Sequence, residues 1–219
     1  MRELAPNGRL TPLLYAILRL PRFQIDPGSA KVAVDRLPYC ERLSPEAKNA
    51  LLEAIELDLL ASDNEITRDI CKKSSAACFS KAAETQLRTI FEAFREIYSP
   101  SDSKELTAEA KLSETGGDSF FYKFLVNGKR LTLGDMLKAM KKAGASALNL
   151  RALRDFRLHL GAHYPKLLLR ESLIALSELR DIGNDHRHNF LPVVRAANAK
   201  ELAAQALQAM LPQKSEIGS

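Results

Sequence analysis

The stretch Lys166–Asn189, KLLLRESLIALSELRDIGNDHRHN, contains the most apolar predicted helix of the chain and a polar segment directly after it. At about 100° per residue, positions spaced i, i+4, i+7 and i+11 share one face of a helix. Here these positions are Leu169, Leu173, Leu176 and Arg180. The face that three leucines are predicted to bury therefore ends in a guanidinium. Because an unpaired buried charge is costly, we expect Arg180 to open onto a cleft or to meet a partner.

The residues after Arg180 predict a helix end. His186 follows six residues later, which corresponds to about 240° in an unbroken helix, so the two side chains would diverge. Gly183 directly follows the last periodic residue, where a glycine usually forms a left-handed C-cap. We therefore expect the helix to end at Gly183-Asn184 and the chain to reverse. His186 would then return to the side of Arg180.

An arginine and a histidine at one cleft can cut RNA. The imidazole can take the proton of a 2′-hydroxyl or donate one to the leaving 5′-oxygen. The guanidinium can hold the phosphate through two hydrogen bonds and stabilise the charge of the transition state. This chemistry needs no metal. The alternative interpretation is structural, with Arg180 and His186 capping carbonyls at the negative end of the helix dipole.

The rest of the chain predicts an all-α helical bundle with one small β-hairpin. Caps and apolar periodicity predict helices over residues 11–20, 44–61, 65–98, 132–140, 150–161, 165–182 and 198–211. Residues 21–38 are predicted to be irregular, and 99–118 a polar loop. Asn127-Gly128 between two short apolar runs indicates a hairpin over 120–133. We expect an N-terminal segment with a short helix (1–43), the bundle (44–211) and a disordered tail (212–219).

Composition restricts the class of protein and its partners. The 219 residues carry a net charge of +5, but residues 119–219 hold 16 Lys/Arg against 8 Asp/Glu. This basic half favours an anionic partner such as nucleic acid, unless the acidic half simply covers it. The three cysteines, Cys40, Cys71 and Cys78, lack metal-ligand spacing and indicate reduced thiols in a cytoplasmic protein. No segment reads as a signal peptide or a transmembrane span.

The motif Leu-Arg-Asp-x4-His at a helix end, followed by an Ala/Leu-rich last helix, resembles the HEPN superfamily over about residues 85–211. The helix opening Leu131–Leu137, LTLGDML, is also met in such proteins. The resemblance implies a metal-independent endoribonuclease that leaves 2′,3′-cyclic phosphate ends, works as a homodimer with the motif paired across the interface, and serves as a toxin or in antiviral defence. A regulatory protein partner fits such a role.

The resemblance also assigns residues. Arg180, Asp181 and His186 would be catalytic, and Asn184, Arg187 and His188 would contact nucleic acid. No cofactor and no metal would be needed. Asp181 stands where asparagine is more familiar in the family, and an anion beside a phosphate site weakens phosphate binding.

Two rival classes of function remain open. The bundle can be a non-catalytic interaction or nucleotide-binding module, such as an antitoxin or an adaptor. It can also be a metal-binding helical protein, because His159 and His163 are spaced i, i+4. We expect an antiparallel helix pair to place them far from His186, where they would flank an apolar stripe formed by Leu153, Phe156 and Leu160. A set of basic residues either tracks phosphates or forms a solvated face: Lys138, Lys141, Lys142, Arg151, Arg154 and Arg157.

Overall fold

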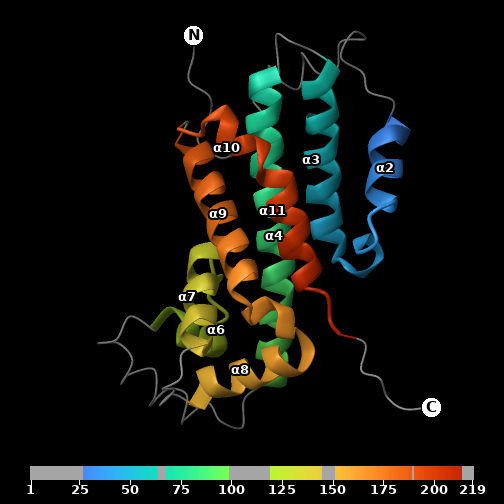
Figure 1. The fold of residues 1–219 in the computed structure, drawn as a ribbon. Coiled ribbons are helices and arrows are strands. Elements are labelled where there is room, and N and C mark those ends of the chain that lie inside the picture. Colours follow the sequence, from blue (N-terminus) through green and yellow to red (C-terminus); the bar gives the residue numbers. More distant parts are fainter. Residues whose placement is uncertain (1–26, 64–67, 99–118, 145–150, 189, 214–219) are drawn as a thin grey trace, which may run out of the picture.

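The computed structural model describes residues 27–63, 68–98, 119–144, 151–188 and 190–213, and within these ranges the protein is all-α (Figure 1). The elements follow in this order: α2 (Pro27–Asp35), a 3-10 turn η2 (Cys40–Arg42), α3 (Pro45–Asp63), α4 (Arg68–Ile97), α6 (Ser119–Asn127), α7 (Leu133–Gly144), α8 (Arg151–His163), a 3-10 turn η3 (Pro165–Leu168), α9 (Arg170–Arg187), α10 (Val193–Ala197) and α11 (Ala199–Ala209). The predicted bundle is confirmed. None of the described helices is long and apolar enough to cross a membrane.

Helix α4 is the centre of the bundle. It spans 30 residues without a break at Ser74-Ser75, since the hydroxyl of Ser75 donates a hydrogen bond of 2.7 Å to the Ala54 carbonyl of α3. Helices α3, α9 and α11 pack along α4 (Figure 1), and α7 and α10 contact it as well. Alanines in its buried face let these helices approach closely. One continuous apolar core results.

Residues 27–35 form a helix, so the irregular segment expected over 21–38 is wrong in that part. Pro27 occupies the first helical position, where a missing N–H costs nothing, and does not only mark a turn. Helix α2 packs on α3, and Ala30, Val34 and Tyr39 belong to the same buried core as the bundle. The helix predicted over 11–20 and most of the tail lie outside the described residues.

The hairpin predicted over 120–133 is wrong, because residues 119–127 form helix α6. Asn127-Gly128 does change the direction of the chain, but it does so at the end of a helix. Gly128 is left-handed, with φ of 64°, and its N–H donates to the Phe124 carbonyl at 2.9 Å. The bond from Gly128 is the 5→1 bond of an αL helix C-cap, and the N–H of Lys129 donates to the Lys123 carbonyl at 3.3 Å. Periodicity cannot separate a strand from a buried helix in so short an apolar run.

Helix α7 begins as predicted, with a capping box. The Thr132 hydroxyl accepts a hydrogen bond from the N–H of Asp135 at 3.2 Å, and the Asp135 carboxylate accepts one from the N–H of Thr132 at 3.2 Å. After α7 the chain forms α8, which crosses the lower end of the bundle, and then α9, which runs back to the upper end (Figure 1). Helix α7 packs against both α4 and α9, which positions its N-terminus.

Candidate functional site at the end of helix α9

Helix α9 continues through Gly183 and ends only at Arg187, so the predicted break is wrong. Among the described glycines only Gly128 has a positive φ. The role of Gly183 is close approach between helices. An ideal Cβ at this position would lie 2.7 Å from Oγ of Ser80 on α4, and that hydroxyl donates a bond of 2.7 Å to the Leu179 carbonyl. The glycine therefore lets α9 lie directly on α4.

This contact predicts the effect of a methyl group. Gly183→Ala should lower the free energy of unfolding by about 1 kcal/mol or more, because the buried Ser80 hydroxyl must give up its hydrogen bond. In a Ser80→Ala background the same substitution should raise that free energy by about 0.5–1 kcal/mol, the ordinary gain in helix propensity. Urea unfolding of the four proteins of this cycle measures both effects. If alanine destabilised the protein equally in both backgrounds, a strained glycine conformation would be the better explanation.

The buried face of α9 differs from the predicted one. Its members follow the spacing i, i+3, i+7, i+10 and i+14: Ser172, Ala175, Leu179, Ile182 and His186. The first four are buried, and His186 is half-buried at the end of the stripe. On the predicted face Leu176 is buried but Leu169 is 51% exposed. His186 therefore points into the bundle, whereas Arg180 lies at the edge of the buried face.

Arg180 and His186 are consequently not brought side by side within one chain. Along a continuous helix they are separated by about 9 Å of rise and point about 120° apart. The expectation that the chain reverses between them is wrong, and its physical reason is the packing of Gly183 on Ser80. The C-terminal half of α9 therefore carries two groups of polar residues on different faces, one around Arg180 and one around His186.

The first group surrounds Arg180. Its Nε and Nη2 donate hydrogen bonds of 2.9 and 2.7 Å to the same carboxylate oxygen of Asp181. Its Cδ lies 3.6 Å from the place of an ideal Cβ on Gly134, so Arg180 lies against the first turn of α7. The two segments that carry the family resemblance thus meet in space. About a third of each side chain of the ion pair is exposed, which leaves the guanidinium accessible to an anion that competes with Asp181.

The second group surrounds His186. Burial lowers the pKa of this imidazole, and the positive charge of Lys73 on α4 lowers it further. The ring is therefore unprotonated at neutral pH and can accept a proton. Lys73 was not among the residues predicted from sequence. Its position depends on the register between α4 and α9, which no local pattern specifies.

The residues predicted to contact nucleic acid lie together at the same helix end. The guanidinium of Arg187 donates to the Gly183 carbonyl at 3.3 Å and to the Asn184 side-chain oxygen. The N–H of His188 closes the helix by donating to the Asn184 carbonyl at 3.2 Å. Arg187 and His188 are exposed, and Asn184 is half-buried. This end of α9 is therefore a cationic, accessible surface beside His186.

The histidine pair of α8 is far from this surface. The rings of His159 and His163 lie 4.8 Å apart, and that of His159 lies 5.4 Å from Phe94. Helix α8, which carries both residues, lies at the end of the bundle opposite the C-terminal end of α9 (Figure 1). In the described ranges no three His, Cys, Asp or Glu side chains gather as a metal site would require. Burial lowers the pKa of His159, and its proximity to His163 lowers it further. The pair thus packs against aromatic rings, beside the apolar stripe of α8.

The cysteines are free thiols. Cys71 is buried in a small cluster with Leu57, Leu60 and Ala61, and Cys78 packs against that cluster. Burial raises the pKa of Cys78 to about 12, so its thiol is protonated and unreactive. Cys71 and Cys78, seven residues apart on α4, are therefore packing residues.

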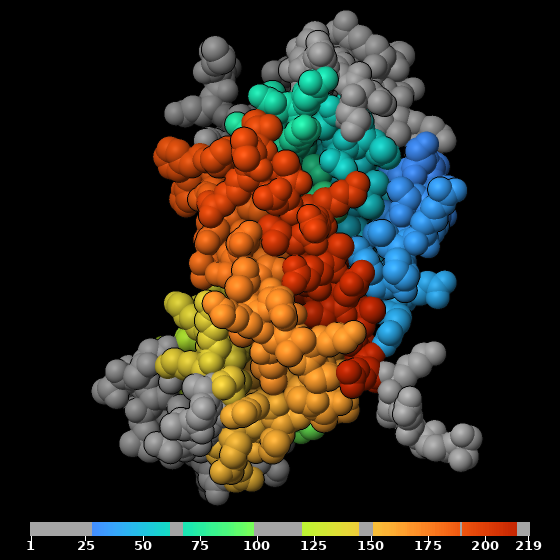
Figure 2. Space-filling model, viewed as in Figure 1, coloured from blue at the N-terminus to red at the C-terminus, as the bar shows by residue number. Residues whose placement is uncertain are grey.

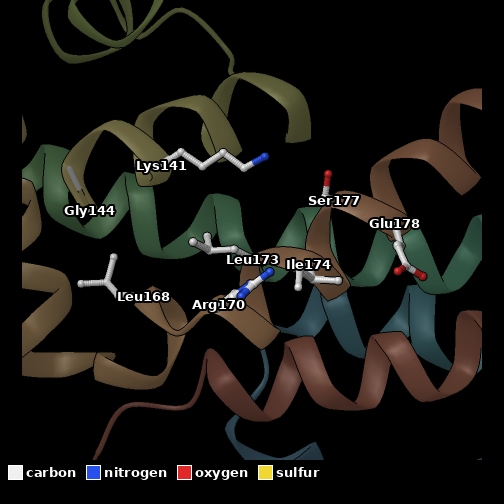
Figure 3. A pocket seen from close by; sticks show the side chains of 8 residues that line it. All are labelled: Lys141, Gly144, Leu168, Arg170, Leu173, Ile174, Ser177 and Glu178. Carbon is white, nitrogen blue, oxygen red and sulfur yellow. The ribbon is translucent and has the colours of Figure 1, made fainter.

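Helices α7 (yellow) and α9 (orange) lie against each other on the surface (Figure 2), and an open depression of about 600 Å³ lies between α7 and the outer side of α9 (Figure 3). Lys141 and Gly144 line it from α7, and Arg170, Ile174 and Glu178 line it from α9. It has an apolar floor with charges of both signs at its rim. The depression lies along the side of α9 that faces away from α4.

Comparisons of the chain with protein-family models, with curated proteins and with solved structures find no match. The interpretation of the site therefore depends on its own residues. Those residues are His186, whose pKa is lowered by burial and by the charge of Lys73, the Arg180–Asp181 pair of α9 that lies against the first turn of α7, and the exposed Arg187.

Proposed function

We propose that the protein is a metal-independent endoribonuclease of HEPN type that acts in the cytoplasm as a toxin or an antiviral-defence effector. The observation that carries the proposal is His186, a half-buried imidazole next to the exposed Arg187 at the end of α9, whose pKa is lowered by burial and by the charge of Lys73. A neutral histidine close to fixed positive charge is suited to remove a proton next to a bound phosphate. The basic C-terminal half of the chain favours an RNA substrate.

In the proposed reaction, His186 takes the proton of a ribose 2′-hydroxyl. The oxygen attacks the adjacent phosphorus, and the bond to the 5′-oxygen breaks. The leaving 5′-oxygen takes a proton from solvent water, and the products are a 2′,3′-cyclic phosphate and a 5′-hydroxyl. Lys73 is the cation whose charge acts on His186, so it would stabilise the reacting phosphate. Arg180 points elsewhere and would hold a neighbouring phosphate, with Asp181 fixing its orientation.

The test is incubation of the purified protein with structured and unstructured RNAs in the presence of a chelator. Cleavage that leaves cyclic phosphate ends, together with intact DNA of the same sequence, supports the proposal. RNA that stays intact under all these conditions contradicts it.

The alternative function is a non-catalytic binding module, such as an antitoxin or an adaptor. The observation in its favour is the Arg180–Asp181 ion pair, because a carboxylate that occupies the guanidinium competes with phosphate. Binding of RNA or of a nucleotide without any cleavage would identify this class.

We further propose that the active form is a homodimer joined through the outer face of α9. Ile174 is 46% exposed at the centre of this face. Arg170 and Glu178 stand four residues before and after Ile174, and neither forms an ion pair with another described residue. A two-fold axis at Ile174 pairs each Arg170 with the Glu178 of the other copy. The face therefore has an apolar centre, and its charges are complementary to those of a second copy of the same face.

A further inference from the structure

Phe190 stands out among the phenylalanines because its ring is 78% exposed. The other described phenylalanines are buried or packed against the core. Full burial of such a ring would contribute about 1.5–3 kcal/mol, so its exposure is unfavourable for folding alone. Phe190 lies four residues after His186, at the edge of the candidate site.

The backbone that carries this ring is held firmly. The N–H of Phe190 donates a hydrogen bond of 2.8 Å to the Asp185 carbonyl of α9. The Asp185 carboxylate in turn accepts a hydrogen bond from Arg195 of α10, which ties the two helices together. Directly after Phe190, Leu191 is buried and anchors the chain in the core. The ring is thus presented on a fixed support and not on a loose end.

Two exposed arginines flank Phe190 along the chain. Arg187 precedes it by three residues at the end of α9, and Arg195 follows it by five residues on α10. The carboxylate of Asp185 offsets Arg195 alone, which leaves the guanidinium of Arg187 to face an anion. A neutral apolar partner would gain little from such a border. An exposed aromatic face next to cations is instead what single-stranded nucleic acids use, with a base on the ring and a phosphate at the cation.

We infer that Phe190 is a stacking platform for an unpaired nucleobase, with Arg187 binding the phosphate next to that base. This inference rests on the proposal that the protein binds RNA, and it specifies that the RNA is single-stranded where it meets the end of α9. A base stacked here would place the following ribose and phosphate near His186, because the two residues lie at one helix end. Phe190 would therefore position the substrate and take no part in proton transfer.

The chain contains no tryptophan, so Phe190→Trp introduces a single tryptophan at the proposed platform, which can be excited selectively over the five tyrosines. Titration with a single-stranded 2′-O-methyl oligonucleotide, which cannot be cut through its 2′-oxygen, should quench this fluorescence. The duplex of the same sequence should quench it much less. Binding measured by anisotropy of a labelled oligonucleotide should weaken roughly 5- to 150-fold in Phe190→Ala, the loss of one stacked base. Val194→Ala is the matched control, since Val194 is 83% exposed on α10 but has no ring to stack, and its affinity should be unchanged.

Two outcomes overturn the inference. If the oligonucleotide binds but the tryptophan signal stays constant and Phe190→Ala binds as wild type does, the ring is not a platform. If no single-stranded oligonucleotide binds at all, the ring faces another kind of partner. Cleavage of RNA by the wild-type protein is measured separately, so the endoribonuclease proposal stands or falls independently of both outcomes.

Discussion

His186→Ala is expected to lower the rate of RNA cleavage about 10²–10⁴-fold, the usual cost of removing a positioned acid–base group. The substitution removes the half-buried imidazole at the end of the buried face of α9, so the helix itself should persist. Arg180→Ala should also remove most cleavage, because the RNA loses the guanidinium that holds the phosphate next to the reacting one. Single-turnover rates in chelator, with circular dichroism to verify folding, measure both effects. His163→Ala is the matched control, since His163 is exposed on α8 and outside the candidate site, and it should cut at close to the wild-type rate. His188→Ala should lower the rate less than His186→Ala does, because His188 lies outside the motif.

The pH dependence of cleavage gives a second readout of the same residue. Because burial and Lys73 hold the pKa of His186 below its ordinary value of 6.5, the ring stays unprotonated as the pH falls through 6.5. The acid limb of the rate profile should therefore lie below pH 6.5. Lys73→Gln removes the nearby charge and should move this limb toward higher pH. Cleavage by His186→Ala at the wild-type rate would contradict the catalytic role and favour the binding module.

Reversing one charge on the outer face of α9 is expected to abolish the homodimer. Arg170→Glu places two acidic side chains opposite each other twice across the proposed axis, and Glu178→Arg places two basic ones there. Each variant alone should sediment near the chain mass of 24.3 kDa, whereas the wild type should sediment at about twice that mass. An equimolar mixture of the two variants should form a heterodimer, because every facing pair is then of opposite charge. Simple misfolding cannot produce that rescue.

The matched control for charge reversal is Glu201→Arg on α11. Glu201 is exposed, and it lies on a different helix from the proposed interface. This variant should dimerise as the wild type does. Ile174→Arg should abolish the dimer in every combination, because the mixture cannot compensate a charge placed on the axis itself. A wild type that stays monomeric, or variants that fail to pair in the mixture, would rule out this interface.

The sequence predicted correctly those helices that are marked by caps or by apolar periodicity within their own residues. The capping box of Thr132 and Asp135 begins α7 as expected, and the long apolar periodicity of α4 held across Ser74-Ser75. The errors have one physical cause, which is that glycine and short apolar runs are ambiguous without their tertiary neighbours. Gly128 ends a helix and does not turn a hairpin, and Gly183 makes room for Ser80 and does not end a helix.

The candidate site was predicted only in part for the same reason. The residues at the end of α9 could be named because they form a contiguous motif. The direction of His186 could not be predicted, because the buried face of α9 is set by its contact with α4 and not by its leucines alone. Lys73 could not be found, since it lies more than a hundred residues earlier in the chain.

During synthesis on the ribosome, the helices of this bundle emerge in chain order, so the core around α4 is completed late. Helices α3 and α4 emerge consecutively and make the most extensive helix–helix contact, so they can pair early. The side of α4 that α9 and α11 cover stays bare until the last quarter of the chain has been made, on the order of 5–20 s later at usual translation speeds. A nascent chain therefore contains Lys73 long before His186, and the candidate site is complete only after α9 has been made. Chains interrupted before α9 would expose the apolar side of α4 and become targets for chaperones and proteases.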